Sequence, residues 1–157
     1  MERISRVLEY RLWKGHDQYI PLYFYENIEL EQILARRECE FFVKNGVTYK
    51  QLSSAIEQDL YVIYVEIFEE NAPEILQEEK NKGISLEIRE LNAMKNHPIV
   101  QIVSKENHLD ILSMIGSSFL YVNHQEWQRD SAELDEDRLT YVLYGTPTGY
   151  EWEGEWK

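Results

Sequence analysis

The stretch from Phe41 to Tyr49, Phe-Phe-Val-Lys-Asn-Gly-Val-Thr-Tyr, is the strongest local structural signal in the chain. Asn45 and Gly46 stand between two apolar runs. A two-residue type I′ turn needs positive φ at both central residues, and Asn followed by Gly adopts this conformation most readily. The stretch therefore predicts a tight β-hairpin.

A third strand is expected directly after this hairpin. Leu60 to Phe68 is apolar at nearly every position, which is typical of a central strand covered on both faces. The polar residues at 57–59 predict a turn before it. The region from Phe41 to Phe68 thus reads as a three-stranded antiparallel meander.

Two strands and a helix are expected upstream of the hairpin. Arg6 to Trp13 and Tyr19 to Tyr25 are rich in aromatic and branched residues, which favour strands. Pro21 cannot donate a backbone hydrogen bond, so its strand should lie at a sheet edge or start late. Asn27 is expected to cap a short helix that carries acidic residues first and basic residues last.

The second half of the chain predicts four more strands and two more helices. A helix is expected from Pro73 to about Lys82, and another is expected from a Ser104 cap to Ile115, with Gly116 in the left-handed conformation as its stop. Alternating or branched apolar residues predict strands at 84–89, 99–103, 119–122 and 139–144.

Because strands outnumber helices, we expect an α+β fold. The predicted architecture is a mainly antiparallel, strongly twisted sheet of about seven to nine strands with two or three short helices packed against it. A sheet that curves towards a barrel is the alternative. We expect 157 residues to form a single domain, 1–157, without an internal repeat. Residues 77–83 are the only weak candidate for a boundary.

The composition argues against several classes of protein. The formal net charge is −13, and no cluster of Lys and Arg is present, so nucleic acids and anionic membranes are not expected as partners. No apolar run approaches the roughly 18 residues of a membrane span. The single cysteine and the absence of a signal peptide favour a cytoplasmic protein. The acidity fits solubility or a basic protein partner.

No motif for catalysis, metal binding or cofactor binding is recognisable. The four histidines lack zinc-site spacing, and no glycine-rich phosphate loop or serine-hydrolase elbow is present. Cys39 is expected to be a buried structural thiol. The acidic stretch 130–137 is expected to be a solvated loop, because it does not match an EF-hand. We predict no metal and no cofactor, and the sequence does not decide whether the protein is an enzyme.

One carboxylate interrupts the most apolar strand. Glu66 follows Tyr61 and Tyr64, and an unpaired acid inside such a strand would be costly. One interpretation places Glu66 near the strand end or against an arginine. The other is a binding or catalytic pocket with Glu66 surrounded by these tyrosines.

The C-terminal stretch Gly149 to Lys157 alternates aromatic residues with glutamates. We expect it to fold back through a turn at Thr146–Gly149 and become the last strand of its own sheet. This register sets Leu143 opposite Trp152, Tyr141 opposite Gly154 and Leu139 opposite Trp156. The rival prediction makes Tyr150, Trp152 and Trp156 an interface with a second copy or another protein.

The leading functional prediction is a non-catalytic protein–protein interaction or regulatory domain with a protein partner or a homo-oligomeric state. The absence of a catalytic motif, the acidity and the aromatic strand surface support it. The alternative is a small-molecule-binding or enzymatic α+β domain with an aromatic pocket near Glu66. A third idea is that rows of carboxylates mimic DNA.

Overall fold

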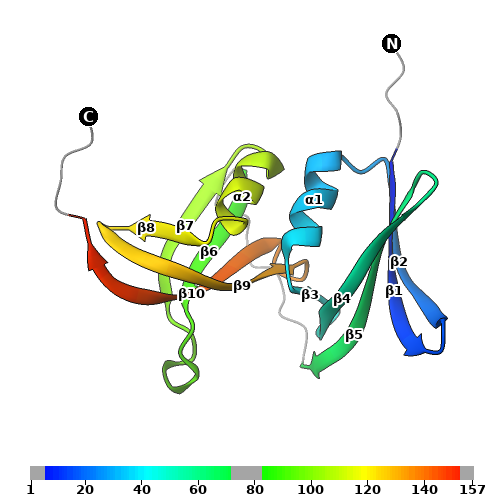
Figure 1. The fold of residues 1–157 in the computed structure, drawn as a ribbon, viewed down its shortest axis with the longest axis horizontal. Coiled ribbons are helices and arrows are strands. Elements are labelled where there is room, and N and C mark those ends of the chain that lie inside the picture. Colours follow the sequence, from blue (N-terminus) through cyan, green and yellow to red (C-terminus); the bar gives the residue numbers. More distant parts are fainter. Residues whose placement is uncertain (1–5, 72–82, 153–157) are drawn as a thin grey trace, which may run out of the picture.

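The computed structural model describes residues 6–71 and 83–152. The described chain forms one mixed β-sheet with two helices packed against the same side of it (Figure 1). The helices are α1 (Leu30–Glu38) and α2 (His108–Ile115), and a 3-10 turn spans Ala93–Lys95. The strands are β1 (Val7–Gly15), β2 (Gln18–Glu26), β3 (Phe41–Lys44), β4 (Val47–Glu57), β5 (Leu60–Glu70), β6 (Ile84–Glu90), β7 (Ile99–Lys105), β8 (Phe119–Val122), β9 (Gln125–Asp135) and β10 (Thr140–Glu151).

The strand order corrects the predicted sheet. The order is β2-β1-β5-β4-β3-β9-β10-β6-β7, and β8 pairs with β9, so the sheet has 10 strands. The pairs β1–β5, β6–β10 and β3–β9 are parallel. A predominantly β fold with two helices packed on the sheet is confirmed, whereas a mainly antiparallel sheet of seven to nine strands is wrong. Local patterns identify strands and hairpins, but they carry no signal for pairing between distant strands.

The chain is built from two repeats of one topology, which the sequence analysis missed. Repeat 1 (residues 6–71) runs from the hairpin β1–β2 through α1 to the meander β3–β4–β5, with β5 parallel to β1. Repeat 2 (residues 83–152) runs from the hairpin β6–β7 through α2 to β8–β9–β10, with β10 parallel to β6. The weak boundary expected at 77–83 falls between them.

The registers of the two repeats agree residue by residue. Phe41 lies opposite Lys50 in repeat 1, and Phe119 lies opposite Gln128 in repeat 2, an offset of 119 − 41 = 78. The register shift between β1 and β2 lies at Tyr10/Arg11, and the shift between β6 and β7 lies at Ile88/Arg89, again 78 residues later. This agreement is the pattern expected of an internal duplication.

Short sequence matches then become visible. The run at 8–11, Leu-Glu-Tyr-Arg, corresponds to Leu-Glu-Ile-Arg at 86–89, and Tyr-Val-Ile-Tyr at 61–64 corresponds to Tyr-Val-Leu-Tyr at 141–144. The second offset is 141 − 61 = 80. The loop between β9 and β10 is therefore two residues longer than the loop between β4 and β5. Keeping the offset of 78 through Asp137 assigns the two extra positions to Arg138 and Leu139.

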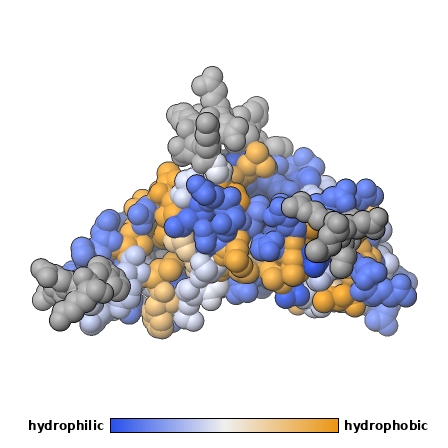
Figure 2. Space-filling model, turned by 90° about the horizontal axis from the view of Figure 1, so that it is seen from above, coloured by the Kyte–Doolittle hydropathy of each residue, from blue (hydrophilic) through white to orange (hydrophobic). Residues whose placement is uncertain are grey.

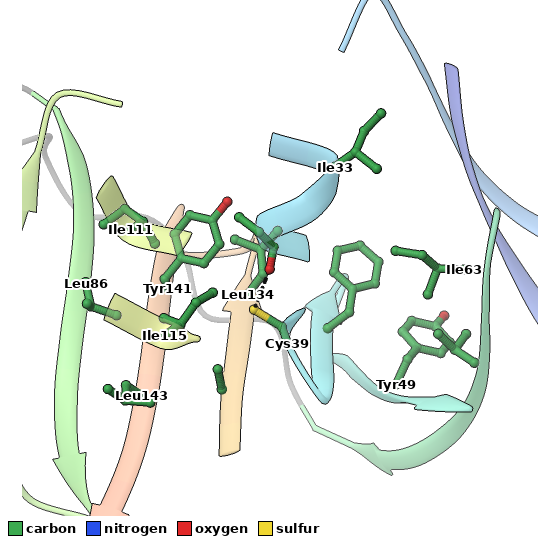
Figure 3. Close-up of a cluster of buried hydrophobic side chains, with 14 of the residues drawn as sticks. Ile33, Cys39, Tyr49, Ile63, Leu86, Ile111, Ile115, Leu134, Tyr141 and Leu143 are labelled. Carbon is green, nitrogen blue, oxygen red and sulfur yellow. Dashed lines mark hydrogen bonds between the residues drawn. The ribbon is translucent and has the colours of Figure 1, made fainter. Parts of the chain in front are cut away.

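The hydrophobic core is continuous across the two repeats. Figure 3 shows side chains of repeat 1, such as Ile63, and of repeat 2, such as Leu86, on either side of Cys39 and Leu134. Cys39 is buried, as expected, and burial raises the pKa of its thiol. The two helices are nine and eight residues long, and neither is long and apolar enough to cross a membrane, in the part of the chain that the structure describes.

Several local predictions are confirmed, and three predictions for the helix ends are wrong. Asn45 and Gly46 have φ of 52° and 77° in the expected turn, and β2 lies at a sheet edge. Helix α1 begins after Glu29 rather than at Asn27. Helix α2 is capped by Asn107, whose side chain accepts a hydrogen bond from the Asp110 N–H, and not by Ser104. The helix ends at Gly116 as expected, but this residue has φ of −86° rather than the left-handed conformation. The helix expected from Pro73 lies outside the described residues.

The acidic stretch 130–137 is largely strand β9, not a solvated loop. Its residues Ala132 and Leu134 are buried against the core, and Glu133 points to the other face of the sheet. The many charges in this stretch concealed a period-two pattern. The sheet has a charged outer face here, opposite the face that the helices cover.

The predicted C-terminal hairpin is also wrong. Strand β10 continues through the expected turn, with Pro147 opposite Trp127 and Glu151 opposite Gln125 on β9. Leu143 therefore lies opposite Ala132 rather than Trp152. Pro147 lies beyond the part of β10 that pairs with β6, so its missing N–H interrupts no bond to β6. The expected pairings with Gly154 and Trp156 lie outside the described residues.

Candidate functional site

The two repeats meet where β3 pairs with β9. Residues 41–43 of β3 run parallel to residues 133–135 of β9. Strand β8 pairs with the same edge of β9 at residues 125–128. Along one edge of β9, therefore, β8 occupies the first part of the strand and β3 occupies the last part.

The loop after β9 inserts a carboxylate into repeat 1. Glu136 Oε1 accepts a hydrogen bond from Arg36 Nη2 at 2.8 Å, and Oε2 accepts one from Tyr25 Oη at 2.6 Å and lies 3.1 Å from Lys44 Nζ. Burial would raise the pKa of Glu136, but the charge and hydrogen bond of Arg36 lower it below its usual value. Arg36 is only 5% exposed, so this is a buried ion pair between the repeats.

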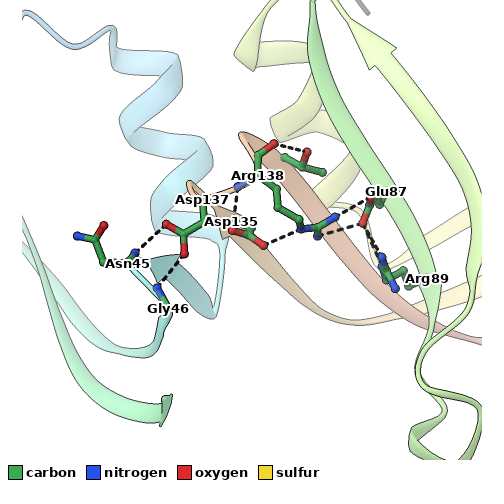
Figure 4. Close-up of polar contacts among 8 residues, drawn as sticks. Asn45, Gly46, Glu87, Arg89, Asp135, Asp137 and Arg138 are labelled. Carbon is green, nitrogen blue, oxygen red and sulfur yellow. Dashed lines mark hydrogen bonds and ion pairs between the residues drawn. The ribbon is translucent and has the colours of Figure 1, made fainter. Parts of the chain in front are cut away.

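The next two residues of the loop extend the junction in opposite directions (Figure 4). The Asp137 carboxylate accepts hydrogen bonds from the backbone N–H groups of Asn45 and Gly46 at 2.7 and 2.8 Å, which holds the turn between β3 and β4. Arg138 donates to Asp135 at 2.8 Å and to both oxygens of Glu87 at 2.9 and 3.1 Å.

An ion-pair chain continues across the outer face of repeat 2. Arg89 lies 3.0 Å from Glu87 and donates to the His97 carbonyl oxygen at 2.9 Å. Burial would raise the pKa of Glu87, but the hydrogen bonds and charges of Arg138 and Arg89 lower it. Glu87 and both arginines are therefore charged and already engaged.

Between these groups lies a cleft of about 350 Å³ that both repeats line. Its four acidic side chains outnumber its two arginines. Among the described residues, no arginine and no backbone N–H binds the carboxylates of Glu69 and Glu133. We call this cleft the junction cleft. Its lining residues are Val43, Gly46, Thr48, Glu69, Asn71, Arg89, Asn96, His97, Glu133, Asp135, Asp137, Arg138 and Tyr144.

Glu133 is the distinctive group of the junction cleft. Burial, and then the neighbouring carboxylates of Asp135 and Glu87, raise its pKa to about 7, which the positive charges of Arg138 and Arg89 only partly oppose. Among the described residues, no hydrogen-bond donor or cation binds the Glu133 carboxylate. Burial and the charge of Glu133 also raise the pKa of Tyr144 to about 12.

A larger but more open cavity of about 820 Å³ lies between the first turns of α1 and α2. Figure 2 shows the molecule from above, where hydrophobic residues lie in separate groups among hydrophilic ones. His108 lies at the edge of this cavity, with its Nδ1 3.0 Å from the Tyr141 hydroxyl. Burial together with the charge of Arg36 lowers the pKa of His108. No comparable unpaired buried acid lines this cavity in the described part of the chain, so the junction cleft is the stronger candidate.

The structure does not bring the predicted pocket residues together. Glu66 is exposed on β5, and Tyr64 faces Arg11 on the outer face, where its hydroxyl accepts a hydrogen bond at 3.0 Å. Tyr61 packs against the core on the other face of the strand. Neither cavity is lined by these residues. A binding role for Glu66, Tyr61 and Tyr64 stays a prediction.

The predicted interface residues lie near the end of the described chain. Tyr150 is exposed and contacts the ring of Tyr121 edge-on at 6.4 Å. The Trp152 ring stacks on the His124 ring with 6.2 Å between their centres, and the backbone N–H of Trp152 donates to the His124 carbonyl oxygen at 2.7 Å. Trp156 lies outside the described residues. An interface role for the three aromatics also stays a prediction.

Sequence reasoning missed the junction cleft. The signal was present in the alternation of residues 131–135, in which Leu134 is inward and Glu133 and Asp135 are outward. Within residues 6–71 and 83–152, no three His, Cys, Asp or Glu side chains converge to hold a metal ion. The chain matches no protein-family model, no curated protein and no solved structure.

Proposed function

We propose that this protein is a non-catalytic interaction module that binds a basic protein partner by taking a lysine or arginine side chain into the junction cleft. The observation that carries the proposal is Glu133, a half-buried carboxylate to which no residue in the described part of the chain supplies a cation or a hydrogen-bond donor. Burying an unpaired carboxylate is costly, and a guanidinium or ammonium group from a partner would remove that cost.

The surroundings of Glu133 support a cation from outside the chain. The two arginines that line the junction cleft are held by Glu87 and Asp135. At about 350 Å³ the cleft is at the small end of the range of ligand pockets, and it has room for a lysine or arginine side chain. The net charge of −13 would accelerate the encounter with a basic partner.

A carboxylic acid with a pKa near 7 also suits general acid–base catalysis, which is the second candidate function. The described lining of the junction cleft includes no serine or cysteine nucleophile. Its histidine, His97, is held at Nδ1 by the Asn92 N–H at 2.9 Å. Binding is therefore the function that the geometry favours.

The test is calorimetric titration of the full chain with a short arginine-rich peptide, compared with the variants Glu133→Gln and Glu66→Gln. We expect Glu133→Gln to weaken binding about tenfold or more, because it removes the charged partner from a desolvated pair. Glu66→Gln removes one exposed acid, so the net charge of both variants is equal, and it should bind like the wild type.

The pH dependence separates the cleft from general charge attraction. A cation beside Glu133 lowers the pKa of this group, so binding at pH 7 should release protons, and affinity should rise from pH 6 to pH 8. Glu133→Gln should abolish the proton release. Equal weakening by the two variants would contradict the proposal, and loss of binding only in Glu66→Gln would move the site to the β5 tyrosines.

A further inference from the structure

We propose that a second copy of this chain adds to the sheet, with β8 of one copy pairing with the free edge of β4 of the other. The pairing copies the β3–β9 junction within one chain. This inference is independent of the junction cleft and of any basic partner.

The internal junction provides the template. Val43 of β3 lies opposite Asp135, and its carbonyl oxygen accepts a hydrogen bond from the Glu136 N–H at 2.9 Å. On its other side, β3 pairs with β4, and the Gln51 N–H donates to the Glu40 carbonyl at 2.8 Å. Because backbone groups alternate along a strand, Phe41 and Val43 direct theirs to β9.

Strand β8 is the equivalent of β3 and has the same backbone alternation. The Arg129 N–H donates to the Ser118 carbonyl at 2.8 Å, which matches the bond from Gln51 to Glu40 at an offset of 78. Phe119 and Tyr121 therefore direct their backbone groups away from β9. No described strand pairs with that edge, and the two side chains are 50% and 46% exposed.

The end of β4 is the equivalent of the β9 edge that β3 occupies. Strand β3 covers β4 only at Val47–Lys50, whereas residues 55–57 correspond to 133–135. The loop from Glu57 to Leu60 is a two-residue hairpin turn, so Ile56 directs its backbone groups away from β5, to an edge that no described strand occupies at this position. Ile56 is 57% exposed, whereas its equivalent Leu134 is 6% exposed.

The side chains at the two free edges are matched in polarity. At the internal junction, Glu136 meets the charged groups of Arg36 and Lys44. At an offset of 78, the acid becomes the neutral Gln58, and the two cations become Met114 and Val122. These positions are uncharged on β8 and on the β4 edge, so the pairing of two copies would bury no unpaired ion between them.

Asp59 gives a further match in sequence position. It lies 78 residues before Asp137, which binds the turn at Asn45 and Gly46, and the turn 78 residues after that one is Asn123 and His124, with φ of 51° and 66°. In the pair of copies, Asp59 would accept hydrogen bonds from the N–H groups of that turn. The two edges thus complement each other, which favours a second copy over an unrelated protein as the occupant.

The first test is sedimentation of the full chain over a concentration range up to ~1 mM. We expect concentration-dependent association that strengthens with added salt, because each copy carries a charge of −13. Ile56→Lys and Tyr121→Pro should each abolish it. Proline at 121 removes an N–H that points away from β9, so β8 can remain paired. The control is Ile102→Lys, which charges an equally exposed residue on the β7 edge.

The second test mixes the two variants. Ile56→Lys retains an intact β8, and Tyr121→Pro retains an intact β4 edge, so the mixture should form one-to-one pairs although neither variant associates alone. Circular dichroism and melting curves confirm that each variant is folded. A monomeric wild type at the highest concentration, association unaffected by both substitutions, or a mixture that stays monomeric would each overturn the proposal.

Discussion

The two repeats share one topology, but equivalent arginines on their outer faces make different contacts. In repeat 1, Arg11 donates to Glu9 at 2.7 Å, to Glu57 at 2.9 Å and to the Tyr64 hydroxyl at 3.0 Å. Its guanidinium also lies 4.2 Å from the centre of the Tyr19 ring. This cluster is closed, because every carboxylate in it shares one buried arginine.

In repeat 2, the equivalent of Arg11 is Arg89, and the cluster is open. Asp135, the equivalent of Glu57, binds Arg138 from the two-residue extension of the loop rather than Arg89. Glu133 stands where repeat 1 has Ala55. One Ala-to-Glu difference and one short insertion thus distinguish a closed ion cluster from an acidic cleft on the same scaffold.

The largest effect is expected at the contact that only one repeat makes. Glu136→Ala leaves Arg36 buried without its carboxylate, and the Nε of this arginine already has no partner in the described chain. We expect a loss of about 3–5 kcal/mol in the free energy of unfolding, measured by urea denaturation. The matched control is Gln58→Asn, which keeps a residue that tolerates the positive φ and should change stability by less than about 0.5 kcal/mol.

Glu133→Gln should stabilise the protein in a pH-dependent way. The raised pKa means that the folded protein binds a proton at Glu133 between about pH 4.5 and 7 that the unfolded chain releases. Stability is therefore lost as the pH rises through this range, and the variant avoids the loss. The difference between variant and wild type should grow from near zero at pH 4 to as much as about 3 kcal/mol at pH 8. A difference that does not change with pH would contradict this account.

The two equivalent arginines should differ in their contribution to stability. Arg11→Met leaves Glu9 without its ion-pair partner and removes the hydrogen bond to Tyr64, so we expect a loss of about 2 kcal/mol. Arg89→Met leaves Glu87 still bound by Arg138, so the loss should stay below about 1 kcal/mol. Parallel thermal melts measure the stability of both variants. Equal losses of stability would contradict the prediction that Arg138 compensates for the missing Arg89 at Glu87.

The smallest effect is expected at the paired hairpin turns. His124 has positive φ where repeat 1 has Gly46, so His124→Gly should stabilise the protein by less than about 1 kcal/mol. Gly46→Ala should have the opposite sign, because it adds a side chain at φ 77°. A loss of stability in His124→Gly would mean that its contact with Trp152 outweighs the backbone strain.

The sequence predicts the parts of the fold that depend on neighbouring residues. The Asn45-Gly46 turn, the meander that follows it and the edge position of the strand with Pro21 all follow from local chemistry. Parallel pairing was not predictable in this way, because Val7 and Leu60 meet without any turn residue to mark the pairing. The change of offset from 78 to 80 also concealed the duplication.

The candidate site was less predictable than the fold. Glu133 has a raised pKa only because the sheet places it near Asp135 and Glu87, and Glu87 belongs to a distant strand. Glu66 appeared unusual because it interrupts an apolar run, yet β5 is exposed from that residue onward. An apolar pattern indicates a buried strand, but it does not show at which residue the strand extends beyond the elements that pack on it and becomes exposed.

The parallel junction between β3 and β9 has a consequence for the order in which the protein is made. Phe41 can pair with β9 only after Glu133 has been synthesised, which is 133 − 41 = 92 residues later. At ordinary rates of synthesis this delay is about 5–20 s, long compared with the formation of a hairpin. During that interval the nascent first repeat exposes the β3 edge, and neighbouring ribosomes on one message carry chains with the matching strand. Such polysomes would be where mispaired chains first arise, and a slower-translated message would lengthen the exposure.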